Sequence, residues 1–489
     1  MLSAFDNFPA LLIWLPLIGG IISFMLPQGD RAKAWSMLSS ILTLVVAGAS
    51  LLFTGSEHFA LTQVSYVWLP ILGSSFTLSL DGISWILCLL NAISFPLIFA
   101  ASARNSYRRP NVFYGLMLIA QAGLMGVFMA LDALTFYFFW ELALIPVYFL
   151  ASMWGGEKRI QAAFKFFIYT FVGSLLLLVG ILYVYLKTPD QSFALASFYR
   201  AQLTVGEQGW LFWMFFIAFA IKMPVFPFHT WQPDAYEQSA TPVTMVLSGI
   251  MVKMGVFALM RWLLPVFPDV IADYDNIIIG FSVIGVVYAS LMAMRQDDLK
   301  RLVAYSSIAH IGLMSAAIFS LQQDAWHGAL VQMFSHGINI IGMWIVIELI
   351  EQQLGVRKIS ELGGIAQKAP TLTIFLVIIA LANVALPLTN AFVGEFLMFS
   401  GLFRFNSWYA AVAGIGIILS AVYTLNMIKH VFYGNTNILT ETINDIRTDQ
   451  RIVLSVIVVL IFMVGIYPEP MFRLVENTSD IILNRIQTK

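Results

Sequence analysis

Long apolar stretches separated by short polar connections run through almost the whole of this 489-residue chain. A helix needs about 20 mostly apolar residues to cross the hydrocarbon core of a bilayer, and stretches of that length recur about fourteen times. The pattern therefore predicts spanning helices, which we number in chain order. They are expected near residues 9–26, 34–54, 80–102, 112–131, 133–153, 161–186, 209–231, 241–263, 271–294, 299–320, 326–350, 371–402, 408–432 and 451–468.

The amino-acid composition also predicts that lipid surrounds these helices. Hydrophobic residues make up 60% of the chain and charged residues 11%, whereas a soluble chain carries about 25% charged residues. No water-soluble core could absorb this much apolar surface, so lipid must surround the helices. The first apolar run, 10–26, lacks a basic segment before it and is interpreted as a spanning helix rather than a signal peptide. We predict an all-α polytopic membrane protein with a single transmembrane domain over residues 1–489.

The net charge, the cysteine count and the absence of certain motifs exclude several classes of site. A formal net charge of −1 gives no sign of nucleic-acid binding or of a basic membrane-surface anchor. Cys88 is the one cysteine, so neither an internal disulfide nor a thiolate-held iron–sulfur cluster can form within the chain. The histidines form no HExxH pair, and no GxGxxG follows a predicted strand. We therefore expect no cofactor and no metal in this chain.

The basic residues predict an orientation. Most of the 26 Lys and Arg residues lie in or beside the loops that follow odd-numbered helices. Basic loops stay on the inner side of a membrane, so this distribution places the odd loops inside and both termini outside. Lys222 and Lys253 are exceptions, because they fall within predicted apolar helices.

Four ionisable residues interrupt apolar helices, namely Glu141, Lys222, Lys253 and Glu395. A charge at the bilayer centre costs about 2.5–3.5 kcal/mol on insertion scales, so it persists where it pairs, meets water or becomes neutral. A single such Glu is as readily a structural ion pair or a group at the membrane edge. Neither lysine lies at a predicted helix end, where snorkelling would explain it. Four of these groups on four helices favour a proton relay.

Two histidines and three prolines extend this interpretation. His310 and His336 titrate in the right range to pass protons, although a membrane histidine is also often an interhelical hydrogen-bond contact. Predicted helix 7 contains Pro224 and Pro227, and predicted helix 12 contains Pro387. The two helices are five apart, so matched units around them would run in opposite directions. Inverted repeats with broken helices are typical of ion-translocating folds.

These residues give the chain its resemblance to a known family. It resembles the antiporter-like subunits of respiratory complex I, most closely the subunit M branch, over nearly its whole length. The resemblance implies fourteen helices with two inverted five-helix repeats, 112–264 for helices 4–8 and 271–433 for helices 9–13, with helices 7 and 12 broken. The stretches that carry it are 138–142, 222–234, 252–255, 304–307, 335–337, 392–396 and 465–468.

The resemblance also implies roles for the buried residues. Glu141 and Lys222 would form an entry pair, Lys253 a central relay, and Glu395 the terminal site, where Glu marks the subunit M branch and related subunits have Lys. The chain departs from the family at 233–241, which lacks the family's histidine, and at 386–392, which lacks a glycine-rich segment. His310 and His336 would flank the path that connects these sites.

The expected function is proton translocation as a membrane-arm subunit of NADH:quinone oxidoreductase. Flavin (FMN), iron–sulfur clusters and quinone would belong to partner subunits, and the antiporter-like subunits L and N would be neighbours. The expected location is a bacterial inner membrane rather than a mitochondrial one. Alternatives are a subunit of a Mrp-type sodium/proton antiporter, a subunit of a hydrogenase-linked membrane complex, and a structural scaffold whose buried charges are dispensable.

Overall fold

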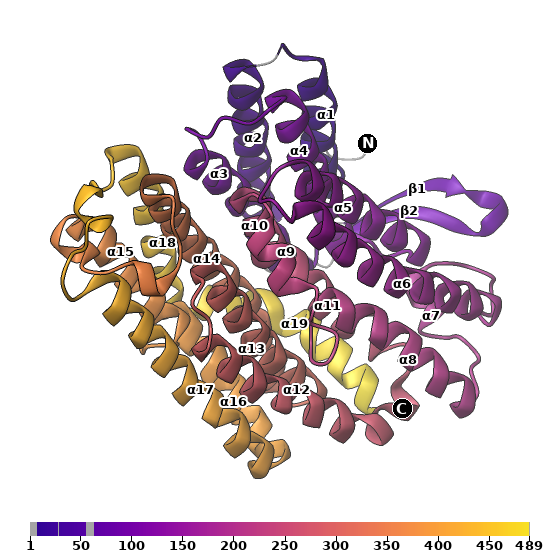
Figure 1. The fold of residues 1–489 in the computed structure, drawn as a ribbon. Helices are drawn as coiled ribbons and strands as arrows, with labels where there is room; N and C mark the ends of the chain where they lie inside the picture. The colour runs from indigo at the N-terminus through magenta and orange to yellow at the C-terminus, as the bar shows by residue number, and fades with distance from the viewer. Residues whose placement is uncertain (1–6, 28, 55–62, 489) are drawn as a thin grey trace. The chain divides into compact units, whose positions relative to one another are not determined.

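A computed structural model describes residues 7–27, 29–54 and 63–488, and Figure 1 colours the chain from indigo to yellow along its length. These residues form two compact units that alternate along the sequence. The first unit takes in the chain up to Met223, Ile250–Asp275 and the segment from Arg473 onward. The second unit takes in Pro224–Gly249 and Asn276–Phe472.

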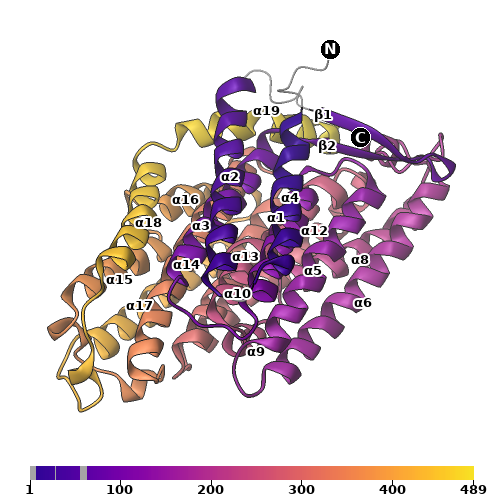
Figure 2. The same cartoon turned by 90° about the horizontal axis from the view of Figure 1, so that it is seen from above.

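Long helices build most of the first unit, and α1 to α4 lie side by side in Figures 1 and 2. Small residues let α4 and α5 approach closely, as is common between membrane helices. A Cβ atom at Gly126 would lie 2.2 Å from the ring of Phe139, and one at Gly123 would lie 2.6 Å from the Ala143 nitrogen. The helices of this unit are α1 (Phe8–Met25), α2 (Asp30–Thr54), α3 (Gly82–Ala101), α4 (Pro110–Met129), α5 (Ala133–Met153), α6 (Arg159–Leu186), α7 (Leu195–Phe198), α8 (Val205–Lys222) and α11 (Val252–Ala258).

Two elements of the first unit were not predicted from the sequence. Strands β1 (Gln63–Leu69) and β2 (Ser74–Ser79) pair as an antiparallel hairpin. Helix α19 (Glu469–Gln487) reaches this unit from Arg473 onward, and a Cβ atom at Gly82 would lie 1.6 Å from the Leu474 carbonyl oxygen. One face of α19 is apolar and buried through Val475, Ile482, Leu483 and Ile486.

Helix α14 is the centre of the second unit, where it packs against α10, α13, α15, α16 and α18. α14 (Gln323–Leu354) is almost wholly buried, whereas α17 (Ser407–Met427) and α18 (Thr448–Ile466) expose much of their apolar surface, as helices in contact with lipid do. The remaining helices are α9 (Gln232–Gln238), α10 (Thr241–Val246), α13 (Leu299–Phe319), α15 (Pro370–Asn383) and α16 (Asn390–Phe405), with most of α12 (Ile271–Met294).

Twelve of the fourteen predicted spans are confirmed as continuous helices. Within the described residues, 12 helices are long and apolar enough to cross a membrane. The other two predicted spans, 209–231 and 371–402, are broken. In the first, α8 stops at Lys222 before α9, and in the second, α15 stops at Asn383 before α16. Proline accounts for both breaks, because it lacks the N–H that an uninterrupted helix needs. The two inverted repeats, 112–264 and 271–433, stay a prediction.

Candidate functional site

Lys222 occupies the last position of α8 in the first unit. The expectation that neither buried lysine lies at a helix end is therefore wrong for Lys222, because the proline-containing break begins directly after it. The side chain is nevertheless buried, with the residue 2% exposed. Its Nζ lies 5.3 Å from the centroid of the Trp140 ring and has no hydrogen-bond partner among the described residues. When Lys222 is protonated, the aromatic face and the negative end of the α8 dipole stabilise its ammonium group.

Glu141 lies on α5 and is half-buried. Its Oε1 accepts a hydrogen bond from the Ser174 hydroxyl of α6, and the Tyr137 hydroxyl lies 3.2 Å from the same Ser174 oxygen. The carboxylate also borders an apolar surface hollow beside Phe138 and Ile145. Glu141 and Lys222 were expected to pair, but in the structure Glu141 is bonded to Ser174, and Nζ of Lys222 is not hydrogen-bonded to any described residue.

Lys253 is fully buried on α11. Two π-helical segments, Leu247–Met251 and Leu259–Leu263, flank this helix, and such segments often occur at functional sites. A Cβ atom at Gly255 would lie 2.7 Å from the Phe219 carbonyl oxygen, which only glycine allows at this approach of α11 to α8. Lys222 and Lys253 therefore lie on helices that touch.

The second unit joins His310 of α13 to Glu395 of α16. Nδ1 of His310 lies 3.0 Å from Oε1 of Glu395, and both side chains are 7% exposed. Gln332 of α14 donates a hydrogen bond of 3.2 Å to the same carboxylate oxygen. The ring of His336 lies 5.4 Å from that of His310, centroid to centroid. A buried carboxylate with an imidazole partner is an arrangement that can hold and exchange one proton.

A polar stripe on α14 faces α16, and sequence analysis identified only one of its members. Asn339 and Asn390 exchange two amide hydrogen bonds of 3.0 Å, and the Ser335 hydroxyl donates to the Asn390 carbonyl oxygen at 3.2 Å. Gly394 allows this approach, since a Cβ atom there would lie 2.7 Å from the Gln332 amide oxygen. The spacing i, i+3, i+4 and i+7 within an apolar helix is the signal that could have found the stripe. Its members are Gln332, Ser335, His336 and Asn339.

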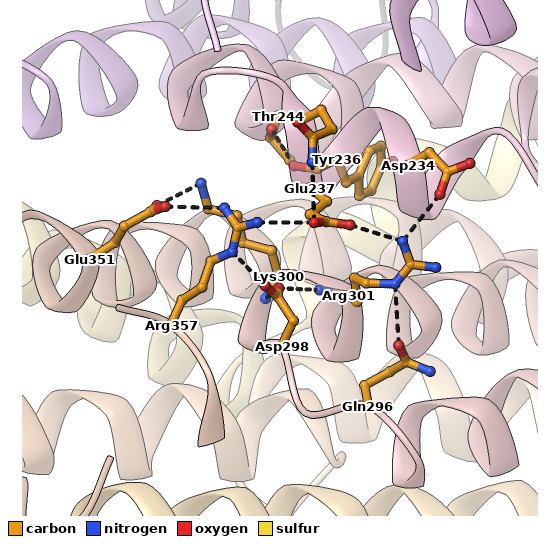
Figure 3. Close-up of polar contacts among 11 residues, drawn as sticks. Asp234, Tyr236, Glu237, Thr244, Gln296, Asp298, Lys300, Arg301, Glu351 and Arg357 are labelled. Atoms are coloured by element: carbon orange, nitrogen blue, oxygen red, sulfur yellow. Dashed lines mark hydrogen bonds and ion pairs between the residues drawn. The ribbon is translucent and has the colours of Figure 1, made fainter. Parts of the chain in front are cut away.

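A network of charged residues, also missed, joins the ends of three helices of the second unit (Figure 3). Arg301 bonds to Glu237 at 2.8 Å and to Asp234 at 3.1 Å, which fastens α9 to the start of α13. Arg357 bonds to Glu237 at 3.0 Å. The network also contains Asp298, Lys300 and Glu351, and its members lie in or beside the connections after the predicted spans 209–231, 271–294 and 326–350.

Arg357 is the hub of this network. It contacts Glu237, Asp298 and Glu351. Burial by itself would lower the pKa of its guanidinium, but these three carboxylates outweigh burial and raise the pKa above its ordinary value. The ion pairs of the network join the ends of α9, α13 and α14, which suits a clamp rather than a proton-exchanging site.

The six predicted site residues thus fall into two groups. Glu141, Lys222 and Lys253 belong to the first unit, and His310, His336 and Glu395 belong to the second, each group on helices that pack within its own unit. No three His, Cys, Asp or Glu side chains gather as a metal site requires, within residues 7–27, 29–54 and 63–488. The chemistry that this arrangement offers is proton exchange between buried amines, imidazoles and carboxylates.

Comparisons with known proteins agree with this geometry. The profile of the NADH:quinone oxidoreductase/Mrp antiporter transmembrane family matches residues 130–420. NADH-quinone oxidoreductase subunit M of Rickettsia typhi is 34% identical over 481 residues, covering 96% of this chain and 97% of the relative. F(420)H(2) dehydrogenase subunit M of Methanosarcina mazei is 34% identical over 485 residues, covering 97% and 98%. A chain of respiratory complex I from Thermus thermophilus with bound NADH matches with a TM-score of 0.90, 27% identity and coverage of 98% and 99%.

Proposed function

Because the chain belongs to the NADH:quinone oxidoreductase/Mrp antiporter transmembrane family, we propose that it translocates protons as a membrane-arm subunit of a respiratory NADH:quinone oxidoreductase. The family resemblance seen in the sequence is confirmed by these matches. The observation that carries the proposal is the buried His310–Glu395 contact at 3.0 Å, together with two lysines buried in apolar helices. Such groups are costly in a membrane unless they exchange protons or pair.

Within this chain, the proposed transfer begins at Glu141 and Lys222. A carboxylate that moves to about 4 Å from an ammonium stabilises it by about 4 kcal/mol at an effective dielectric constant of about 20. That energy corresponds to a change in proton affinity of roughly a thousandfold. If Glu141 leaves Ser174 and approaches Lys222, the lysine takes up a proton, and if it returns, the lysine releases that proton toward Lys253. The receiving groups beyond Lys253 would be His336, His310 and Glu395.

Electron transfer would take place elsewhere in the complex. We assign flavin, iron–sulfur clusters and quinone to partner subunits, and the neighbouring antiporter-like subunits L and N to the flanks of this chain. The chain is a multi-pass membrane protein. Its relatives include bacterial proteins from Rickettsia typhi and Escherichia coli, which supports a bacterial inner membrane. Two inverted repeats, 112–264 and 271–433, each with one broken helix, would supply the two halves of the path.

One relative favours a second candidate for the electron donor. The F(420)H(2) dehydrogenase subunit M is as similar to this chain as the NADH-linked relatives are. The proton-moving part would be the same in both machines, and the donor would be set by partner subunits. Purification of the intact complex with its flavin and iron, followed by assays with NADH and with reduced F(420), would decide between the two donors.

The experiment that tests proton translocation uses inverted membrane vesicles and scores NADH oxidation and NADH-driven acidification together. Glu141→Gln, Lys222→Ala and Glu395→Gln are each expected to abolish acidification while the complex still assembles. Glu157→Gln is the matched control, because Glu157 is an exposed carboxylate in the loop that follows α5. Full acidification by all three variants would refute the proposal and favour a structural scaffold, and sodium-driven proton exchange would then be assayed.

A further inference from the structure

Tyr423, on α17, lines two separate cavities of the second unit. One is a small cavity of about 20 Å³ that is also lined by His310, Glu395 and Ser420. The other is a hollow of about 300 Å³ at the ends of α12 and α17. Its lining includes exposed polar residues, namely Asp297, Ser360, Asn426 and His430.

Hydrogen bonds hold the Tyr423 hydroxyl in the protein interior. It donates to the Ser306 hydroxyl of α13 at 2.8 Å, and Asn383 Nδ2 donates to the same Ser306 oxygen at 3.3 Å. All three side chains are buried. Asn383 is the last residue of α15, so it lies where the predicted span 371–402 breaks between α15 and α16. Ser306 lies one turn before His310 on α13, so the two side chains share one face of that helix.

The small cavity has the size and polarity that an ordered water needs. A cavity must offer about 10–15 Å³ and two to four polar partners to hold one water molecule, and this one measures about 20 Å³. Glu395, His310 and Tyr423 lie on its wall. Nε2 of His310 is buried and has no hydrogen-bond partner in the described part of the chain. A water at this place would join the Tyr423–Ser306 hydroxyls to the His310–Glu395 pair.

We infer that Tyr423 and Ser306 form a hydroxyl link through which Glu395 exchanges protons with the polar hollow at the ends of α12 and α17. The Tyr423 oxygen takes a proton from a hydronium ion in the hollow, which becomes water, while its own hydroxyl proton passes to Ser306. Ser306 in turn releases its hydroxyl proton to the water of the small cavity, which passes one proton to the Glu395 carboxylate, so neither hydroxyl group gains net charge. The hollow is built from the loops after α12 and α14 and from the end of α17. The sequence places these segments on the membrane side that carries most of the Lys and Arg residues. The inference rests on the proposed proton translocation and gives Glu395 access to that side.

The first test removes single hydroxyl groups from the intact complex in inverted vesicles. Tyr423→Phe keeps the ring and loses the hydroxyl, and Ser306→Ala removes the acceptor. We expect NADH-driven acidification to fall at least about tenfold in each, since a positioned proton-transfer group contributes about 10²–10⁴-fold. Tyr409→Phe is the matched control, because this tyrosine of the same helix bonds to the Asn276 carbonyl oxygen at 3.2 Å and lines neither cavity.

A second test does not depend on how Tyr423 variants fold. Asn426→Cys places a thiol in the hollow, while the native Cys88 is buried. A cationic, membrane-impermeant thiol reagent added outside inverted vesicles should then block acidification by this variant and leave the unmodified chain active. A block produced only from the vesicle interior, or none after complete labelling, would overturn the inference. Normal acidification by Tyr423→Phe would overturn it too, whereas the proposed function itself fails only if Glu141→Gln, Lys222→Ala and Glu395→Gln all pump normally.

Discussion

The buried ion pair between Asp81 and Arg261 gives a sharp test of how charges are tolerated in the first unit. Nη2 of Arg261 lies 2.7 Å and 2.6 Å from the two carboxylate oxygens of Asp81, and the side chains are 7% and 12% exposed, respectively. Asp81 also caps α3, because its Oδ1 accepts a hydrogen bond of 3.0 Å from the Ser84 backbone nitrogen. Asp81→Ala therefore removes a cap and leaves a buried guanidinium without its counter-charge.

The two effects can be given separate magnitudes. Removing one partner of a buried ion pair costs about 3–5 kcal/mol, and losing an N-cap costs about 1 kcal/mol. We expect Asp81→Ala to lower the free energy of unfolding by about 4–6 kcal/mol. Asp81→Asn keeps the cap and one hydrogen bond to Arg261, so it should lose about 2–3 kcal/mol. The double variant Asp81→Ala with Arg261→Met removes both charges and should lie within about 1–2 kcal/mol of the parent.

The assay is unfolding of the purified chain in mixed micelles with increasing denaturing detergent, followed by tryptophan fluorescence. It compares the parent, Asp81→Ala, Asp81→Asn, Arg261→Met and the double variant. The double-mutant cycle isolates the Asp81–Arg261 coupling from the cap. A double variant that is as unstable as Asp81→Ala would refute the reasoning, because the cost would then come from lost packing or capping rather than from an unpaired buried charge.

Two further predictions concern the second unit. Arg357→Ala removes the hub of the charged network and should cost about 1–3 kcal/mol of unfolding free energy, given its partial exposure. Lys358→Ala, at an exposed neighbour, should change stability by less than about 0.5 kcal/mol, and equal effects in the same detergent assay would contradict the assigned clamp. Burial would raise the pKa of Asp445, but hydrogen bonds from Thr371, Ile446 and Leu372 lower it below its ordinary value. The folded state therefore binds a proton at Asp445 less readily than the unfolded chain. The resulting stability is present above the ordinary carboxyl pKa and is lost as the pH falls through the lowered one. Thermal melts between neutral and acidic pH should show a smaller decline for Asp445→Asn than for the parent.

Much of the helical architecture could be predicted from the sequence, because lipid imposes a simple rule. Each span needs about 20 apolar residues, and the runs stand out so clearly that twelve of the fourteen predicted spans are recovered as continuous helices. The two helix breaks were also predictable, since Pro224 and Pro387 lack the backbone N–H group that donates the hydrogen bond of a continuous helix. Ionisable residues inside such runs are conspicuous for the same physical reason, their cost in hydrocarbon.

Side-chain partners were decided by the tertiary structure. Glu141 and Glu395 look alike in the sequence, each within an apolar run, yet one is half-buried and bonded to Ser174 while the other is buried against His310. Arg261, which stands near the end of the predicted span 241–263, is buried with Asp81 from a segment 180 residues away. Hydropathy is a property of one position, whereas a partner depends on which helix faces that position.

The same distinction explains the elements that sequence analysis missed. The hairpin of β1 and β2 is held by backbone pairing between two segments, and a span pattern cannot show such pairing. The helix α19 lies in a segment too polar to read as a span, and it forms where a neighbouring surface covers its apolar side, as the close approach of Gly82 to Leu474 shows. The bilayer, which acts on every residue alike, lets the sequence by itself determine how many helices cross and where they break. Close contacts between distant segments determine which buried charges meet, and those contacts exist only in the folded chain.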